Sequence, residues 1–556
     1  MITAIVPVTL SFSRQSLHAP PMPRIHLLLL LVLPIHHVSG QTGILDASFS
    51  ADGRALTPPF VNTAGSTMYI TDMDVQSFGG IIAVGIGDWM GSPAEHTDMI
   101  VARYAPDGLL DPSFGGENGY YRLDMADGYD RAYAVAAQAD DRIVVVGSGW
   151  PDPDVTGSDL VVLRLLPNGA VDNTFNGIGI RTLDIGGSGQ VGNDVIIRSN
   201  GKIVVVGSTS TPSSDSDLLV VQLNADGSLD NSFSFDGIQT TSLDPTSYET
   251  AQAVVELSNG ELVVAGNTES EALLVRYLSN GTLDLSFSGD GKAVFAPLNS
   301  DPIWLPSMRV TGIDADDAGR LYVSATLTST NVMDPSFTQT TGYILRCLPN
   351  GDIDPEFQWL SFVNHDVNAV ALMDNGSFLC AGSSPSYPAD PSDMVLWRFS
   401  ANGQPEPVFG NNGRLEVDFN NGHDRCTALR LQPDGRVLIG GATDHIGDSR
   451  YQFALARVLN DPDIGVAEFT LAANASIYPV PVAEGFQFSY TLATPTMLSC
   501  SLVDMQGRVV RTFFQNTHRT VGPHHEPLSV DGVAPGRYQV LLQNEHGTCS
   551  LAIIKQ

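Results

Sequence analysis

The feature that most constrains the fold is a short pattern, Gly-x-x-Asp/Glu-x-x-Phe, which recurs seven times along the chain. The 360 residues from Phe49 to Phe409, the first and last phenylalanines of the pattern, span six intervals with a mean length of 60 residues. A repeat of this length is typical of chains that stack one small structural unit many times. The copies lie at residues 43–49, 108–114, 169–175, 227–233, 281–287, 351–357 and 403–409.

Two strand-like runs accompany every copy in a fixed order. The first usually follows an Asp-Gly or Asn-Gly pair, which supplies the positive φ angles of a tight hairpin turn. It covers residues 81–85, 142–147, 202–207, 261–266, 320–325, 377–382 and 436–441. The second has the form apolar-apolar-Arg-apolar, with Gln222 in one copy and, in the others, Arg103, Arg164, Arg276, Arg346, Arg398 and Arg457. Further apolar runs before the turn and after the phenylalanine raise the count to four predicted strands per repeat.

One four-stranded sheet cannot bury both of its faces, but seven sheets arranged radially cover one another. The sequence therefore predicts an all-β chain, with a seven-bladed β-propeller over residues 41–460. The 54 glycines, 34 prolines and only 16% charged residues agree with many short turns. Within the motif, we expect the carboxylate to accept backbone N–H bonds and the phenylalanine to fill the space between sheets. A linear array of separate hairpin domains is the alternative, and either end of the repeat region could complete the last blade.

The form Leu-Asp-x-Ser-Phe, at residues 45–49, 110–114, 229–233 and 283–287, resembles the bacterial delta-60 repeat. The resemblance covers residues 43–460, and it implies a propeller fold without implying any enzymatic activity. The copies at 351–357 and 403–409 depart from the pattern, with Glu356 in place of Ser and Gln404-Pro405-Glu406 in place of Leu-Asp. We therefore expect the last blades to be irregular.

Residues 1–40 have the layout of a secretory signal peptide. Met22-Pro23-Arg24 precedes an apolar run at 27–33 and small residues at 38–40, which predicts cleavage near Gly40 and a translation start at Met22. No apolar run is long enough for a spanning helix. The net charge of −33 argues against a nucleic-acid partner, because the phosphate backbone is held by basic surfaces.

A linker at 461–475 precedes residues 476–556, which predict a small immunoglobulin-like β-sandwich. Its strand-like runs cover 485–492, 498–504, 508–514, 526–530, 538–544 and 548–554. Cys500 and Cys549 both lie in such runs, so that a disulfide between them is one alternative in an exported protein. Cys347, Cys380 and Cys426 are expected to be small core residues.

This C-terminal segment resembles the type A sorting domain of the type IX secretion system of Bacteroidetes. The resemblance rests on Tyr478, Pro479 and Pro481 at its start, on Asp504 and Gly507 in the middle, and on Gly536 and Tyr538 near its end. It implies passage through the periplasm to the outer surface or the medium, with the type IX secretion machinery as partner. Val480 stands where the family usually has Asn, and an ordinary immunoglobulin-like ligand-binding domain remains the alternative.

Catalytic signals are weak. The sequence lacks zinc-ligand spacing, a nucleophile elbow and a Walker loop, and we predict no catalytic, cofactor or metal residues. Acidic pairs such as Asp140-Asp141 are expected to cap turns, with weak or structural Ca²⁺ sites as the alternative. Trp89 and Trp150 closely follow the apolar strand of their repeats, and they are the candidate ligand-facing aromatics.

The sequence predicts an exported, monomeric, non-catalytic propeller that binds a glycan or protein at one end of the disc. The rival is a cell-surface hydrolase, such as a glycosidase, whose carboxylates converge in the central channel. Paired buried acids in a pocket would favour the hydrolase, whereas an exposed surface of aromatic and polar loop residues would favour binding.

Overall fold

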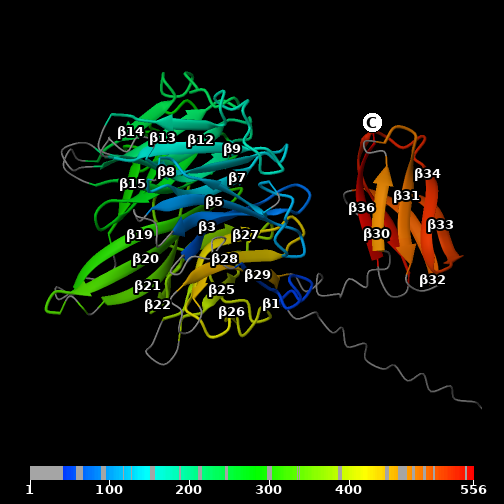
Figure 1. The fold of residues 1–556 in the computed structure, drawn as a ribbon. Coiled ribbons are helices and arrows are strands. Elements are labelled where there is room, and N and C mark those ends of the chain that lie inside the picture. Colours follow the sequence, from blue (N-terminus) through cyan, green and yellow to red (C-terminus); the bar gives the residue numbers. More distant parts are fainter. Residues whose placement is uncertain are drawn as a thin grey trace, which may run out of the picture. The chain divides into compact units, whose positions relative to one another are not determined.

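The computed structural model consists of strands, turns and loops (Figure 1). It describes residues 42–555 except 58–66, 89–95, 117, 127, 151–156, 187–188, 211–215, 244–247, 297–303, 335, 337, 386–390, 445–449, 461–472, 479–481, 493–495, 505–507 and 545–547. The predicted signal peptide lies outside these ranges and stays a prediction. Within them, no helix is long and apolar enough to cross a membrane.

The described residues up to Asn460 form seven antiparallel sheets, and six of these sheets are consecutive four-stranded meanders. The first three blades are β3 (Thr67–Val75), β4 (Ile81–Asp88), β5 (Thr97–Tyr104) and β6 (Tyr120–Leu123); β7 (Arg131–Ala137), β8 (Ile143–Gly149), β9 (Asp159–Leu165) and β10 (Ile180–Leu183); and β11 (Gly189–Ile197), β12 (Ile203–Ser210), β13 (Ser216–Leu223) and β14 (Ile238–Thr241).

Blades four to six are β15 (Thr250–Glu256), β16 (Leu262–Asn267), β17 (Ala272–Tyr277) and β18 (Lys292–Phe295); β19 (Trp304–Ala315), β20 (Leu321–Asn331), β21 (Thr338–Cys347) and β22 (Leu360–Val363); and β23 (Ala369–Leu372), β24 (Phe378–Ser383), β25 (Met394–Phe399) and β26 (Arg414–Val417). The second strand of each blade is the apolar run that follows the tight turn, and the third is the arginine run. Every residue of β8 is buried, because neighbouring blades cover both of its faces.

Residues from both ends of the repeat region build the seventh blade. Its inner strands are β27 (Asp424–Leu431), β28 (Val437–Asp444) and β29 (Tyr451–Leu459), and its outer edge comes from β1 (Ile44–Leu45) and β2 (Arg54–Thr57), both of which pair with β29. Ile44 is opposite Leu459, and Arg54 is opposite Ala456. The N-terminal strands therefore close the ring, and the prediction of seven blades is confirmed whereas the linear array is wrong.

The recurring motif joins each blade to the next. In six blades the arginine of the third strand forms an ion pair of 2.5–2.8 Å with the motif carboxylate eight residues later or, in the closing blade, with Asp46. The same guanidinium donates to a backbone carbonyl of the following blade, as Arg276 does to Pro349 and Arg346 does to Ala401. In five of these blades it also lies 4.7–4.9 Å from the centroid of the motif phenylalanine, a cation–π distance.

The glycine of each motif accommodates the phenylalanine of the preceding blade. Gly227 has a φ of +85°, and a Cβ there would lie 2.8 Å from the ring of Phe175. At the closure a Cβ on Gly43 would lie 2.3 Å from the backbone nitrogen of Gly410, beside Phe409. The motif phenylalanines are fully buried or nearly so, which confirms that they fill the space between sheets. Glycine is thus required both by the backbone angle and by the neighbouring blade.

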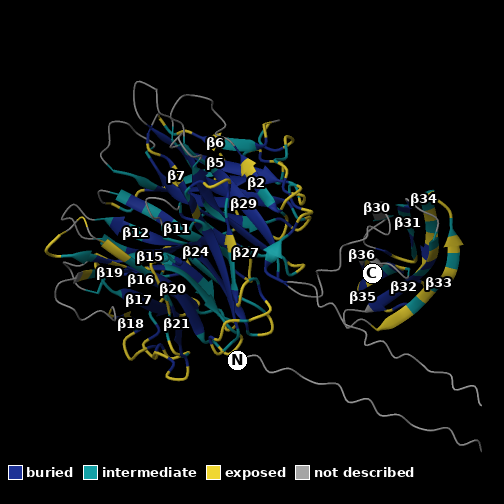
Figure 2. Cartoon of the chain, turned by 90° about the horizontal axis from the view of Figure 1, so that it is seen from below, coloured by how far each residue is buried: buried dark blue, intermediate teal, exposed yellow. Residues whose placement is uncertain are grey.

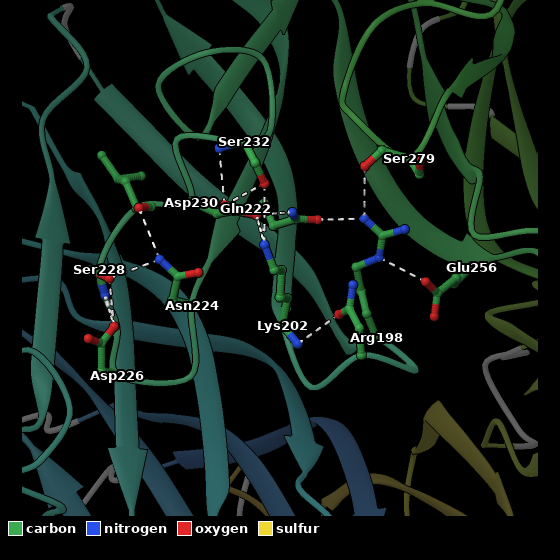
Figure 3. A network of polar contacts seen from close by, with 12 residues as sticks. Arg198, Lys202, Gln222, Asn224, Asp226, Ser228, Asp230, Ser232, Glu256 and Ser279 are labelled. Atoms are coloured by element: carbon green, nitrogen blue, oxygen red, sulfur yellow. Dashed lines mark hydrogen bonds and ion pairs between the residues drawn. The ribbon is translucent and has the colours of Figure 1, made fainter.

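The third blade, in which Gln222 replaces the arginine, obtains its cations from elsewhere (Figure 3). Lys202 pairs with the motif carboxylate of Asp230, and Arg198 donates to the side-chain oxygen of Gln222 at 2.7 Å. Arg198 also donates to the carbonyl of Ser279 in the next blade at 3.3 Å. The contact between blades is therefore kept although the arginine comes from another part of the blade.

The two divergent motif copies keep the ion pair with the arginine of the third strand, and the contact between arginine and motif phenylalanine is found for Arg346. Asp354 and Glu406 pair with Arg346 and Arg398, and both blades have four strands. The expectation of irregular last blades was therefore wrong, because a glutamate reaches its arginine as an aspartate does. Figure 2 shows the blade strands largely buried and the exposed residues concentrated in turns.

The C-terminal unit is a β-sandwich with its own apolar core. One sheet has the order β30 (Ala473–Tyr478), β31 (Gly485–Leu492), β34 (Gly522–Ser529). The other has the order β33 (Val509–Arg519), β32 (Thr496–Asp504), β35 (Gly536–Gln543), β36 (Thr548–Lys555). Phe488, Leu502 and Val540 are fully buried between the sheets, as a sandwich requires.

The sandwich places the two C-terminal cysteines on strands that are not neighbours. Cys500 on β32 is opposite Leu542 on β35, and Leu542 is opposite Cys549 on β36. Since adjacent strands lie about 4.8 Å apart, the two cysteine Cα atoms are separated by roughly 10 Å. A disulfide needs a Cα separation below about 7 Å. The proposed bridge between Cys500 and Cys549 is therefore wrong. Cys347, Cys380 and Cys426 are buried core residues as expected.

Candidate functional site

The central channel of the propeller is lined by one polar residue from the inner strand of each blade. Six of these residues sit at a β-bulge within the strand, and Asn368 immediately precedes β23 in the sixth blade. Together they surround a cavity of about 560 Å³. The seven residues, called here the channel ring, are Thr71, Tyr133, Asn193, Gln252, Thr311, Asn368 and Thr427.

Five members of the channel ring bind the next blade. Their side chains donate to backbone carbonyls across the blade boundary at 2.6–2.9 Å. Thr427 donates to the carbonyl of Ile70, so that the ring of bonds also crosses the closure between the last and first blades. These five side chains are therefore part of the structural framework.

Tyr133 and Gln252 do not form such a bond within the described structure, and Arg309 lies beside them. The Gln252 amide is 3.3 Å from the hydroxyl of Thr250, and its oxygen accepts from Arg309 at 3.4 Å. Arg309, two residues before the bulge of β19, is exposed and lines the same cavity. A phenol, an amide and a guanidinium are thus exposed to the cavity from blades two, four and five.

Farther along the inner strands the channel narrows and becomes charged. A space of about 160 Å³ is lined by Asp72, Asp194 and Arg430, among other residues. Arg430 pairs with Asp72 at 3.3 Å. Burial, with a contribution from the charge of Asp72, raises the pKa of Asp194 to about 6, and burial also raises the pKa values of Asp72 and Asp314.

These deep carboxylates accept hydrogen bonds from the following blade. The backbone N–H of Val135 donates to Asp72 at 3.0 Å, and that of Val254 donates to Asp194 at 2.8 Å. Asp314 accepts from Leu372 in the same way at 2.8 Å. The other oxygen of Asp194 accepts from Val195. These carboxylates are therefore fixed acceptors between blades, although Asp72 and Asp194 also line the narrow space.

Of the two predicted ligand-facing aromatics, Trp89 lies outside the described residues. Trp150 is partly buried, and its ring packs edge-on against Tyr129 with centroids 5.6 Å apart. Its backbone N–H donates to Asp130 at 3.1 Å. It is not among the residues that line the channel cavity. Tyr133 and Arg309 were missed from the sequence, because several polar residues recur along the inner strands and only the closed ring shows which of them face the channel.

Acids from different segments meet at two blade boundaries. His96, Asp98 and Asp124 form one group and Asp393, Asp418 and Asp424 form the other, each with ligand atoms within 4.8 Å of one another. Burial, reinforced by the charges of Asp393 and Asp418, raises the pKa of Asp424 to about 7. Sequence spacing could not find these groups, because each draws on separate segments of the chain.

The acidic pair singled out in the sequence has the expected structural role. Asp140 accepts the backbone N–H of Arg142 at 3.2 Å, within the turn. Asp141 accepts from the backbone and hydroxyl of Ser77 in the first blade, at 2.6 and 2.8 Å. This pair caps a turn and links two blades.

The sorting-motif residues fall on the sandwich where the structure describes them. Gly536 begins β35, and Tyr538 is buried there with its hydroxyl donating to the carbonyl of Ala534 at 2.9 Å. Asp504 ends β32 opposite Tyr538, and Tyr478 ends β30. The other three predicted motif residues lie outside the described residues, namely Pro479, Pro481 and Gly507.

Comparison with known folds gives a distant set of structural neighbours. The polysaccharide lyase Uly1 is 7% identical with a TM-score of 0.42, and the match covers 76% of this chain and 98% of the lyase. An ulvan lyase of family PL25 is 9% identical with a TM-score of 0.40, covering 74% and 95% of the two chains. The Bacillus subtilis arabinanase Arb43A is 9% identical with a TM-score of 0.25, and the match covers 58% of this chain and 92% of the arabinanase. At this low similarity the activities of these proteins do not transfer to the chain.

No curated protein sequence matches the chain. Family comparison matches residues 81–114, 138–175, 198–233, 257–287 and 432–461 to DUF5122, a β-propeller domain of unknown function. Residues 476–556 match the secretion system C-terminal sorting domain, which indicates export by the type IX system to the cell surface or the medium. Five segments of the propeller are therefore similar to the DUF5122 β-propeller domain, and the segment that follows the propeller is similar to a C-terminal secretion sorting domain.

Proposed function

We propose that the exported propeller is a non-catalytic binding protein whose ligand, a glycan, occupies the open end of the central channel. The observation that carries this proposal is the contrast within the channel ring. Five ring residues are occupied by bonds between blades, whereas Tyr133 and Gln252, with Arg309 beside them, face a cavity of about 560 Å³. That volume is in the usual range of small-ligand sites, roughly 300–1,000 Å³.

The chemistry of these three side chains suits hydroxyl-rich molecules. An amide offers both donors and an acceptor, and a phenol adds a flat apolar face against which a sugar ring can pack. The guanidinium of Arg309 provides several donors in a fixed plane, a geometry that also matches a carboxylate. The group therefore favours an oligosaccharide, and Arg309 would prefer one that carries uronic acid.

The rival function is a hydrolase that uses the deep carboxylates. The raised pKa of Asp194, about 6, is the observation in its favour, because a general acid needs such a value. Against it, Asp72, Asp194 and Asp314 all accept backbone N–H bonds from the neighbouring blade. A carboxylate held in this way is a poor nucleophile, and moving it would break a contact between blades. The geometry therefore supports binding better than hydrolysis.

Binding to an array of neutral and uronic-acid oligosaccharides, followed by calorimetry on the best probe, tests the proposal with the full mature chain. We expect Tyr133→Ala and Arg309→Gln each to raise Kd by about tenfold or more, because a ligand group then loses its partner. Arg131→Gln is the matched control, since Arg131 is exposed at the start of β7 but does not line the cavity. Its Kd should stay within twofold of that of the unaltered chain.

Two results would contradict the proposal. One is the absence of oligosaccharide binding at millimolar concentration, and the other is an equal loss of affinity in the Arg131→Gln control. The release of new reducing ends from the bound probe, abolished by Asp194→Asn, would establish the hydrolase instead.

A further inference from the structure

Three carboxylates gather at the boundary between blades six and seven. Asp393 immediately precedes β25, Asp418 immediately follows β26, and Asp424 is the first residue of β27. One oxygen from each lies within 4.8 Å of one from each of the others. Two of the three therefore belong to the sixth blade, and the third belongs to the inner strand of the closing blade.

One oxygen of Asp424 has no hydrogen-bond partner in the described structure. Its side chain is fully buried, and its Oδ2 accepts the backbone N–H of Phe419 at 2.7 Å. Its Oδ1 is buried without a hydrogen-bond partner. A buried carboxylate oxygen without a donor costs free energy, and here it belongs to a group with two further carboxylates. Such an oxygen is best satisfied by a cation that the neighbouring carboxylates also bind.

A similar group at the first blade boundary contains a built-in cation, although Asp98 Oδ1 is also buried there without a hydrogen-bond partner. Arg122 on β6 binds Asp98 at 2.6 Å and Asp124 at 3.1 Å. In the register between β6 and β5, Arg122 is opposite Ile100, and the next residue, Leu123, is opposite Met99. In the sixth blade the position that corresponds to Arg122 is Glu416, which is opposite Val395 in the register between β26 and β25. The position that holds a cation at the first boundary therefore holds an acid at the other.

We propose that the boundary between blades six and seven binds one Ca²⁺ ion between Asp393, Asp418 and Asp424. The donors are all carboxylate oxygens, which favour a hard cation over zinc or copper. Ca²⁺ accepts six to eight oxygens in flexible geometry, so that loop-borne carboxylates with added backbone or water ligands suit it. Mg²⁺ demands a tighter octahedron and loses its water reluctantly, and it should bind much more weakly.

The place of the ion in the fold gives it a structural role. It would join the last complete blade to the blade that both chain ends build, so that binding would stabilise the closed ring. Loop sites in extracellular modules bind Ca²⁺ with dissociation constants of about 10⁻⁴–10⁻³ M. An exported protein meets Ca²⁺ only after it leaves the cell, and the ion would therefore add stability at its destination. This role is independent of the proposed glycan site.

Calorimetric titration of Ca²⁺ into the chelator-treated mature chain, together with thermal unfolding at 10 mM Ca²⁺ or Mg²⁺, tests the proposal. We expect one Ca²⁺ per chain and a Tm that rises by about 2–4 °C with Ca²⁺, with less than half that rise with Mg²⁺. Asp424→Asn should abolish both effects. Asp98→Asn, the matched change at the boundary that Arg122 already neutralises, should leave both in place.

If Asp424→Asn does not fold, Asp393→Asn provides a second variant, since Asp393 is only half-buried. It should weaken Ca²⁺ binding by about tenfold or more through the loss of one charged ligand. The proposal is wrong if the unaltered chain shows no Ca²⁺-specific binding or stabilisation. It is equally wrong if Asp424→Asn and Asp393→Asn bind Ca²⁺ as the unaltered chain does.

Discussion

At the scale of single residues, the motif residues work as a set of contacts that bind one blade to the next. Arg164 illustrates the set: it pairs with Asp172 at 2.8 Å, lies 4.8 Å from the ring centroid of Phe175, and donates to the carbonyl of Ala225 in the third blade. Both members of the ion pair are almost fully buried. Because one side chain makes all three contacts, its loss leaves the Ala225 carbonyl without this donor and leaves buried Asp172 with Arg142, 3.0 Å away, as its remaining cation.

Arg164→Ala should therefore lower the free energy of unfolding by about 3–5 kcal/mol, the usual cost of removing one partner of a buried ion pair. Urea titration followed by tryptophan fluorescence measures the change. Arg131→Ala removes an exposed arginine and should stay within about 0.5 kcal/mol of the unaltered chain. Equal losses in the two variants would show that the pair contributes nothing specific to the contact between blades.

The buried carboxyls predict an unusual dependence of stability on pH. The pKa of Asp194 is raised to about 6, so that protonation is favoured in the folded chain, and this group should add about 1 kcal/mol of stability as the pH falls from 7 to 5. For motif carboxyls such as Asp172, burial raises the pKa, but hydrogen bonds from Thr174 and the charge of Arg164 outweigh it and hold the pKa below its usual value. Their contribution is present above about pH 4 and is lost as the pH falls below it.

Urea midpoints measured between pH 3 and pH 8 should therefore pass through a maximum near pH 5. Asp194→Asn should reduce the rise between pH 7 and pH 5 by about 1 kcal/mol, leaving the part due to Asp424, whose pKa is raised to about 7, and should keep the loss below pH 4. A stability that falls steadily from pH 7 to pH 5 would contradict the assignment of a raised pKa to Asp194.

At the scale of the elements, the sequence predicted the strands well because their signals are local. The alternation of Asp-Gly turns, apolar runs and arginine runs predicted four strands per repeat. The resemblance to the delta-60 repeat also implied a propeller. What closes the last blade was not predictable, since the pairing of Ile44 with Leu459 joins segments from opposite ends of the repeat region. The channel ring and the acids at 393, 418 and 424 were missed for the same reason, because only the closed ring brings them together.

The motif glycines give a test at this scale. Gly43→Ala would place a Cβ 2.3 Å from the nitrogen of Gly410, whereas Gly201 has a similar positive φ with nothing within 4 Å of its Cβ position. Gly201→Ala should cost about 1 kcal/mol for the backbone angle alone. Gly43→Ala should cost about 1–3 kcal/mol more, because the seventh blade must move away from Gly410 of the sixth. Equal costs, measured by urea titration, would mean that Gly43 does not pack against the sixth blade.

At the scale of the whole molecule, seven sheets that could not bury both faces alone form one closed ring. The N-terminal strands complete the blade that the last repeat begins, so that the first and last segments of the propeller hold each other in place. The C-terminal sandwich is a separate unit with its own core and supplies the export signal. The closed ring also creates the channel and the boundary between blades six and seven, on which the two proposals depend.

The closure itself is tested most directly by a disulfide across the seam. Ile44→Cys with Leu459→Cys places two thiols on paired residues of β1 and β29, within the Cα range that a disulfide spans. Mass mapping of the oxidised mature chain should show this bridge within single molecules, together with a raised unfolding midpoint. The control variant combines Ile44→Cys with Leu278→Cys, because Leu278 in the fourth blade occupies the position that Leu459 has in the seventh. This variant should form no bridge. A bridge that is absent, or that forms only between molecules, would contradict the closed ring.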